Sequence, residues 1–93
     1  MTTSGRTAAM AWFVYIVRCA DRSLYTGVTT DPDKRVGEHN EGNGARYTRS
    51  RLPVELVHLE TAADRSAAMR RESEIKGMRA ADKRRLISEG VGT

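Results

Sequence analysis

The sequence predicts a small α+β domain with elements in the order β-β-α-β-α-α. Short segments rich in aromatic and β-branched residues alternate with longer segments of helical periodicity, and typical helix-start and helix-stop residues bound the longer ones. A chain of 93 residues has room for one hydrophobic core. We therefore predict one folded domain over residues 10–93, a sandwich of sheet and helices, after a disordered lead-in at residues 1–9.

The first two strands are predicted to form a hairpin. Trp12–Cys19 is apolar on both faces, Ala20–Ser23 has the composition of a turn, and Leu24–Thr29 is the second strand. Side chains alternate between the faces of a sheet. Tyr15 and Tyr25 therefore share a face only if an odd number of residues, such as three or five, connects the paired strands.

A helix is predicted over residues 32–40. Asp31 is a typical N-cap, and the proline after it fits the first helical position. Arg35, Val36 and His39 lie on one face of this helix. Because Val36 needs burial, that face turns towards the sheet, and it partly shelters Arg35 and His39.

The second half of the chain predicts a basic loop, a strand and two helices, over residues 43–51, 54–60, 64–76 and 80–89 respectively. Gly77 is expected to end the first of these helices. That helix carries an apolar stripe formed by Ala68, Met69 and Ile75, and Glu72 falls inside the stripe.

Charge and cysteine content limit the classes of function. The net charge of +4 comes entirely from residues 45–93, which carry eleven Lys/Arg and seven Asp/Glu, whereas residues 1–44 carry five of each. A one-sided basic surface suits nucleic acid, although many soluble proteins are mildly basic. Cys19 is the single cysteine, which excludes an internal disulfide and a multi-cysteine zinc site and fits a small buried thiol.

The longest apolar run, residues 8–17, is too short to span a membrane. Its aromatic and β-branched residues fit a strand better than a signal peptide. We therefore expect a cytoplasmic protein that does not interact with membranes.

Glu72 is the most informative residue for chemistry. A carboxylate on an inward helix stripe is unfavourable unless it is paired, protonated or bound to a cation. It either pairs with Arg35 or another arginine, or it binds a divalent metal. Mg²⁺ uses one or two protein carboxylates and completes its octahedron with water and substrate phosphate, so one glutamate is enough.

Four further residues have two interpretations each. Arg35 either clamps a phosphate with its planar guanidinium or pairs with Glu72 or Glu38. His39 either relays a proton, orients a tyrosine or contacts phosphate, or it is simply hydrogen-bonded in the interior. Tyr15 and Tyr25 are core residues or catalysts. A tyrosine base would need a lowered pKa, which Arg35 and Mg²⁺ would favour.

Two basic segments are candidates for contacts with backbone phosphates. They are the loop residues Arg46, Arg49 and Arg51 and the helix cluster Lys83, Arg84 and Arg85. Tyr47, within the loop, can stack on a base. His58, in the predicted third strand, is interpreted as structural.

These motifs together resemble the GIY-YIG nuclease superfamily. The resemblance rests on Phe13-Val14-Tyr15, Tyr25-Thr26-Gly27, Arg35 and His39 on the next helix, and Glu72 on a later one, and it covers residues 12–89. The chain is most similar to small stand-alone bacterial members with a single domain, which are related to the nuclease domain of the bacterial excision-repair nuclease.

The resemblance implies a three-stranded antiparallel sheet flanked by helices and metal-dependent hydrolysis of DNA, with Mg²⁺ or Mn²⁺ as cofactor. It implies that Glu72 holds the metal, that Arg35 stabilises the phosphate in the transition state, and that Tyr15 and Tyr25 activate or position water with help from His39. Gly27 is expected to be structural.

The chain also departs from the family pattern. Phe13, Val14 and Thr26 replace the named motif residues, and no asparagine follows Glu72, whereas many members carry one. We therefore consider three functions: a structure-selective DNA endonuclease acting in repair or recombination, a non-catalytic nucleic-acid-binding module, and a domain that is inactive until a larger repair protein recruits it.

Overall fold

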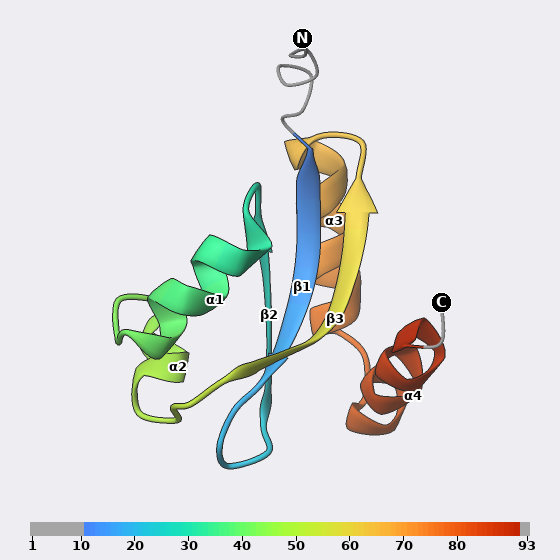
Figure 1. The fold of residues 1–93 in the computed structure, drawn as a ribbon. Coiled ribbons are helices and arrows are strands. Elements are labelled where there is room, and N and C mark those ends of the chain that lie inside the picture. Colours follow the sequence, from blue (N-terminus) through green and yellow to red (C-terminus); the bar gives the residue numbers. More distant parts are fainter. Residues whose placement is uncertain (1–10, 92–93) are drawn as a thin grey trace, which may run out of the picture.

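The computed structural model describes residues 11–91 and confirms the predicted α+β architecture. The predicted lead-in lies outside the described residues. The elements are β1 (Trp12–Arg18), β2 (Leu24–Thr29), α1 (Pro32–Asn40), α2 (Arg46–Arg49), β3 (Glu55–Ala62), α3 (Arg65–Lys76) and α4 (Ala80–Val91) (Figure 1).

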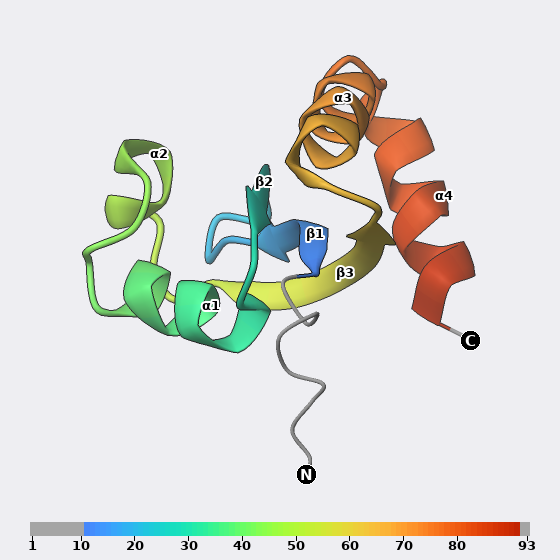
Figure 2. The same cartoon turned by 90° about the horizontal axis from the view of Figure 1, so that it is seen from above.

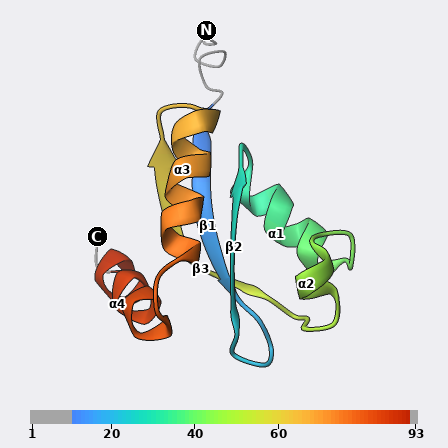
Figure 3. The same cartoon turned by 180° about the vertical axis from the view of Figure 1, so that it is seen from behind.

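The three strands form an antiparallel sheet in the order β2-β1-β3. Helices α1 and α2 lie on one side of this sheet, and α3 and α4 lie on the other (Figure 2). In Figure 3 the long helix α3 lies in front of the strands. None of the helices within residues 11–91 has the length and apolar content that crossing a bilayer requires.

The central strand β1 serves two cores because it is covered on both faces. Val14 and Ile16 pack with Ala68 and Ile75 on the α3 side. On the α1 side, Tyr15 and its neighbours on the same face form a second cluster, which is completed by Tyr25, Val36 and residues before β3. This two-sided burial explains why β1 has no polar face, as its sequence predicted.

The hairpin connection satisfies the odd-number condition. Arg18 pairs with Leu24, so five residues connect the strands, and Tyr25 lies opposite Val17. Because residues 15 and 17 share a face, Tyr15 and Tyr25 also share one, with ring centroids 6.5 Å apart.

Gly27 is required by the ring of Tyr15, its cross-strand partner. A Cβ at position 27 would lie 2.5 Å from the Tyr15 hydroxyl oxygen and 2.6 Å from Cζ. The phenol ring therefore lies directly across the backbone of β2. Since β2 is an edge strand, this brings the hydroxyl towards the open edge of the sheet.

Local signals predicted the helix ends well. Asp31 caps α1 by accepting a hydrogen bond from the backbone N–H of Lys34, and Asp64 caps α3 in the same way through Ala67. Gly77 follows the last residue of α3, as predicted.

Three details of the prediction are wrong. The basic loop contains the one-turn helix α2, which is too short to show a periodic pattern. The third strand begins and ends slightly later than residues 54–60, since Val54 pairs instead with the side chain of Asn40. Met69 is 43% exposed and does not belong to the buried stripe, which contains only Ala68 and Ile75 on α3.

Replacing Gly27 with alanine should destabilise the protein by about 1–3 kcal/mol, because the new methyl group must displace the Tyr15 ring. Urea denaturation would measure this. Gly37 is the matched control, since a Cβ there meets nothing within 4 Å, and Gly37→Ala in helix α1 should be neutral or slightly stabilising. Equal stability of the two variants would contradict the packing of Tyr15 across Gly27.

Candidate active site

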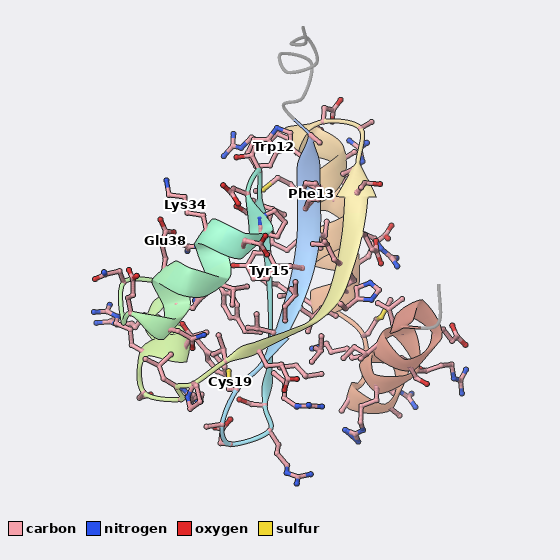
Figure 4. The ribbon with its side chains drawn as sticks, in the orientation of Figure 1. Trp12, Phe13, Tyr15, Cys19, Lys34 and Glu38 are labelled. Carbon is pink, nitrogen blue, oxygen red and sulfur yellow. The ribbon has the colours of Figure 1, made fainter. Side chains whose placement is uncertain are left out.

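The two motif tyrosines and His39 form a compact aromatic group on the α1 side of the sheet. The imidazole centroid lies 5.9 Å from the Tyr15 ring and 5.5 Å from the Tyr25 ring, edge-on to both. Tyr15 and His39 are almost completely buried. Figure 4 shows Tyr15 between β1 and α1, with Lys34 and Glu38 on the far side of α1. The predicted orientation of α1 is therefore confirmed.

Hydrogen bonds hold His39 at both ring nitrogens. Nε2 lies 2.9 Å from the Tyr15 hydroxyl, and Nδ1 lies 2.8 Å from the Thr48 hydroxyl. The Thr48 hydroxyl also lies 2.9 Å from the carbonyl oxygen of Ala45. Sequence reasoning missed Thr48, which is fully buried and comes from the short helix α2.

These contacts assign the imidazole tautomer. If the Thr48 hydroxyl donates to Ala45 O, its oxygen accepts from Nδ1–H, and Nε2 then accepts the Tyr15 proton. This arrangement gives each of the three short contacts one donor and one acceptor. The opposite tautomer would give up the Thr48 bond to Ala45 O, and it would gain only a longer bond of 3.4 Å from the Ala45 backbone N–H to Nδ1.

Burial keeps both partners of the Tyr15–His39 bond neutral. It raises the pKa of the Tyr15 phenol, and the nearby Arg35 guanidinium offsets only part of this effect. Burial likewise lowers the pKa of His39, and the Arg35 charge adds to that change. Arg35 therefore acts on the Tyr15 pKa in the expected direction, but in the protein alone burial is the larger effect and the phenol stays protonated.

Gly44 also supports this arrangement. A Cβ at position 44 would collide with the His39 imidazole and its Cα, so the loop before α2 packs directly on the histidine. Gly44, which lies in the segment between α1 and α2, thus leaves the space that the histidine needs. No pattern within the helix itself could have revealed it.

Arg35 lies beside this group but is engaged with Glu38. The Nη1–Oε1 distance is 2.9 Å, and both side chains are about one-third exposed. Of the partners considered for Arg35, the structure shows Glu38 and not Glu72. A partly exposed pair of this kind contributes little stability, so a phosphate can replace Glu38 at modest free-energy cost.

Glu72 reaches the same sheet edge from the opposite layer. Its side chain is 18% exposed, and it pairs with Lys76 one turn later at 3.3 Å. The Lys76 ammonium in turn lies 6.0 Å from the Tyr25 ring centroid. The negative charge of Glu72 contributes to raising the pKa of Tyr15, although α3 covers the other face of the sheet. Of the two alternatives for Glu72, the arginine pair is not seen within residues 11–91, where its partner is Lys76, and metal binding stays a prediction.

A clamp between α3 and β3 sets the direction of Glu72. Arg71 makes two bonds to the Glu60 carboxylate, of 2.8 and 3.0 Å, and a third to Glu74. Glu60 also contacts buried His58 at 2.7 Å. Arg71 lowers the pKa of Glu60 through these bonds. Because consecutive helical residues project about 100° apart, fixing Arg71 on β3 turns Glu72 away from that strand.

The donor set at Glu72 fits a hydrated hard cation. Within residues 11–91, no three His, Cys, Asp or Glu side chains gather to form a metal site made of protein ligands alone. One sheltered carboxylate, paired only with a half-exposed lysine, can bind Mg²⁺ or Mn²⁺ when water and phosphate oxygens supply the other ligands.

The basic loop becomes part of the same edge. Tyr47 stacks on Tyr25 with centroids 5.9 Å apart and an interplanar angle of 21°, and the Arg51 guanidinium lies 4.0 Å from the Tyr47 ring centroid. Arg51 also pairs with Asp21. Arg46 and Arg49 are exposed. Tyr47 and Arg51 therefore have partners within the protein, while Arg46 and Arg49 point to solvent.

A pocket of about 200 Å³ brings distant elements together at this edge. Its lining includes Tyr25 on β2, Tyr47 on α2, Lys76 on α3 and Lys83 on α4. The two predicted basic segments therefore approach one pocket from opposite sides. Arg84 and Arg85, like Lys83, lie on α4.

The chain matches the family model of the GIY-YIG catalytic domain over residues 11–85. This match defines the class of protein, and its range includes the tyrosine, arginine and glutamate positions described above. The chain belongs to the GIY-YIG family and, within it, to the UPF0213 proteins, with which it shares most of its length. The family resemblance seen in the sequence is therefore confirmed.

Two UPF0213 relatives illustrate the similarity. The protein from Natronomonas pharaonis is 54% identical over 80 residues, covering 86% of this chain and 94% of the relative. The protein from Haloquadratum walsbyi is 58% identical over 79 residues, covering 85% and 89%.

Solved structures agree with the fold. The solution NMR structure of the UPF0213 protein BH0048 from Bacillus halodurans is 44% identical, has a TM-score of 0.55 and covers 85% of this chain and 84% of that one. The solution NMR structure of EF2693 from E. faecalis is 36% identical, has a TM-score of 0.58 and shows the same coverage.

Thr48→Val should destabilise the protein by about 1–3 kcal/mol, because it leaves the buried Nδ1–H of His39 without an acceptor. Thr48→Ser keeps the hydroxyl and should retain that hydrogen bond. Urea denaturation gives the stabilities, and ¹⁵N NMR of the imidazole should show the Nδ1–H tautomer in the unmodified protein. An Nε2–H tautomer there would contradict the assignment.

Stability should fall as the pH is lowered from 7.5 to 5. The pKa of His39 is lower in the folded protein than in the unfolded chain, so the unfolded chain takes up the proton first. The contribution of neutral His39 is complete above the unfolded pKa of about 6.5 and is lost below it, with a slope of at most about 1.4 kcal/mol per pH unit. His39→Gln, which cannot titrate, should show a flatter profile in urea denaturation between these pH values. Parallel profiles would contradict this prediction.

Proposed function

We propose that this protein is a metal-dependent endonuclease that hydrolyses phosphodiester bonds in DNA. The observation that supports this most is the approach of Tyr15, Tyr25, His39 and Glu72 to one sheet edge from both helical layers. Family membership supports nuclease chemistry on DNA in general. The proposal is more specific in three respects. The protein requires a metal, it selects branched or otherwise irregular DNA, and it acts in repair or recombination in the cytoplasm.

Each side chain has a chemical role in this proposal. Arg35 exchanges Glu38 for the scissile phosphate and stabilises the charge that develops on it. The Tyr15 hydroxyl lies at the sheet edge and can orient the attacking water. The Tyr15 hydroxyl donates its proton in a hydrogen bond to His39 Nε2. When the attacking water passes a proton to the phenol oxygen, the phenol can therefore pass its own proton to His39.

Glu72 is the residue that would hold the metal. When bound, a divalent ion supplies Lewis-acid stabilisation of the phosphate and of the leaving oxygen. In the protein alone, Lys76 neutralises Glu72 instead. Because half of the Lys76 side chain is exposed, the ammonium can move to solvent or to a DNA phosphate without a buried charge being left behind.

Five cations of the two basic segments are proposed to hold the DNA backbone. Arg46, Arg49, Lys83, Arg84 and Arg85 carry no carboxylate partner within residues 11–91. Arg51 acts differently in this proposal, since its contacts with Tyr47 and Asp21 shape the loop. A base that stacks on Tyr47 would use the exposed part of its ring.

Glu72→Gln should abolish cleavage, with a loss of at least about a hundredfold, while DNA binding survives. The assay uses branched, flapped, nicked and single-stranded DNA with Mg²⁺ or Mn²⁺ titrated. Glu74→Gln is the matched control on the same helix: Glu74 is 65% exposed and pairs with Arg71, so this variant should cut normally.

The result also separates the candidate functions. If neither the unmodified protein nor the control cleaves any of these substrates, the nuclease proposal is overturned. Binding that persists without cleavage would point to a nucleic-acid-binding module. Cleavage that appears only with a larger repair protein present would point to a recruited domain.

A further inference from the structure

A second pocket lies on the α4 side of the β1–β2 hairpin. It has a volume of about 610 Å³, within the range typical of sites for small molecules. Four cations line it, Arg18 and Arg22 from the hairpin and Lys83 and Arg84 from α4, and no carboxylate does. Leu24 and Ile87 supply an apolar part of the wall.

Three of the four cations are available for a ligand. Arg18 is paired with Glu55 at 3.0 Å. Arg22, Lys83 and Arg84 form no ion pair within residues 11–91. A pocket with an apolar wall and unpaired cations at one place favours a ligand with a flat apolar part and negative charge, which is the chemistry of a nucleotide.

Arg22 adopts a backbone conformation that its residue type disfavours. Its φ is +71°, in the left-handed region, where glycine or asparagine is less strained. Its backbone N–H bonds to Cys19 O and completes the turn, which glycine would do as well. The arginine at this position is therefore better explained by its side chain, which lines the pocket, than by the turn.

The pocket adjoins the candidate active site. Leu24 and Lys83 line both this pocket and the smaller one beside Tyr25, Tyr47 and Lys76. From Gly27 to Leu24 the strand β2 advances about 10 Å. That length corresponds to about three stacked nucleotides at 3.4 Å per nucleotide of one strand.

We propose that this pocket binds an unpaired nucleotide of the DNA strand that enters the active site, about three nucleotides from the scissile phosphate. A paired base inside a duplex cannot enter a pocket of this size, whereas an unpaired one can. Arg22 and Arg84 hold the flanking phosphates, and Leu24 and Ile87 contact the base or sugar. The inference deepens the proposed function, because it gives a physical reason for selecting DNA with unpaired bases.

Binding is measured with metal removed by EDTA, so that no cleavage is needed. Fluorescence anisotropy compares a splayed duplex with unpaired arms against a fully paired duplex of the same length and sequence. The unmodified protein should prefer the splayed DNA. Arg84→Ala should reduce affinity for the splayed DNA by about tenfold, the loss expected for one charged phosphate contact, and should leave the paired duplex much less affected.

The matched control is Arg85→Ala, which removes the same charge one residue along α4 from a side chain that does not line the pocket. Because Arg85 is one of the cations proposed to hold the DNA backbone, the variant should weaken binding to both DNAs to the same extent and so preserve the preference for splayed DNA. Equal losses for the two variants on both DNAs, or no preference in the unmodified protein, would overturn the proposal and leave only general attraction between charges.

Arg22→Gly distinguishes binding from folding. It should raise the melting temperature, because it relieves the left-handed strain, and still weaken binding to the splayed DNA. A more stable variant with unchanged binding would exclude Arg22 from the site. An adenine analogue, 2-aminopurine, scanned through the unpaired arm should change fluorescence most near the third position. A uniform response along the arm would contradict a nucleotide pocket.

The two proposals can fail separately. Glu72→Gln should lose cleavage and keep the preference for splayed DNA, since Glu72 does not line this pocket. A protein that prefers splayed DNA but never cuts would refute only the nuclease proposal. A protein that cuts but binds both DNAs equally would refute only the nucleotide pocket.

Discussion

The position of the Tyr15 ring across Gly27 is the constraint on which the rest of the site depends. Two features produce it: a five-residue turn that puts both tyrosines on one face, and a glycine opposite Tyr15 that leaves room for the ring. The phenol then spans from the central strand to the edge strand. Its hydroxyl forms a hydrogen bond with His39 from one helical layer, and the charge of Glu72 in the other layer raises its pKa.

An edge strand allows so small a domain to build a site from both layers. In the middle of a sheet, the backbone would separate residues on opposite faces. At the β2 edge, α1 and α2 contribute the buried histidine with its threonine partner, and α3 contributes Glu72. The Arg71–Glu60 clamp fixes the rotation of α3, so that the carboxylate points to the edge and not into the core.

Burial and charge have opposite effects at Tyr15, and their balance describes the resting state. Burial keeps the phenol protonated and the imidazole neutral, while Arg35 opposes the first effect and strengthens the second. In the proposed reaction, a metal ion at Glu72 and the movement of Arg35 onto phosphate would change this balance only when substrate is bound. The chemistry would then be confined to the complex with DNA.

The sequence by itself determined the element order, the cap at Asp31, and the residue types of the site. Such signals act within a few positions along the chain, through alternation, helical spacing and capping. Only the tertiary structure decided which partners those residues have: Thr48 for His39, Lys76 for Glu72 and Glu38 for Arg35. It also showed that burial outweighs Arg35 at Tyr15 and that the hairpin and α4 share a basic pocket. These features depend on the packing of segments distant in the sequence, and no local pattern records that packing.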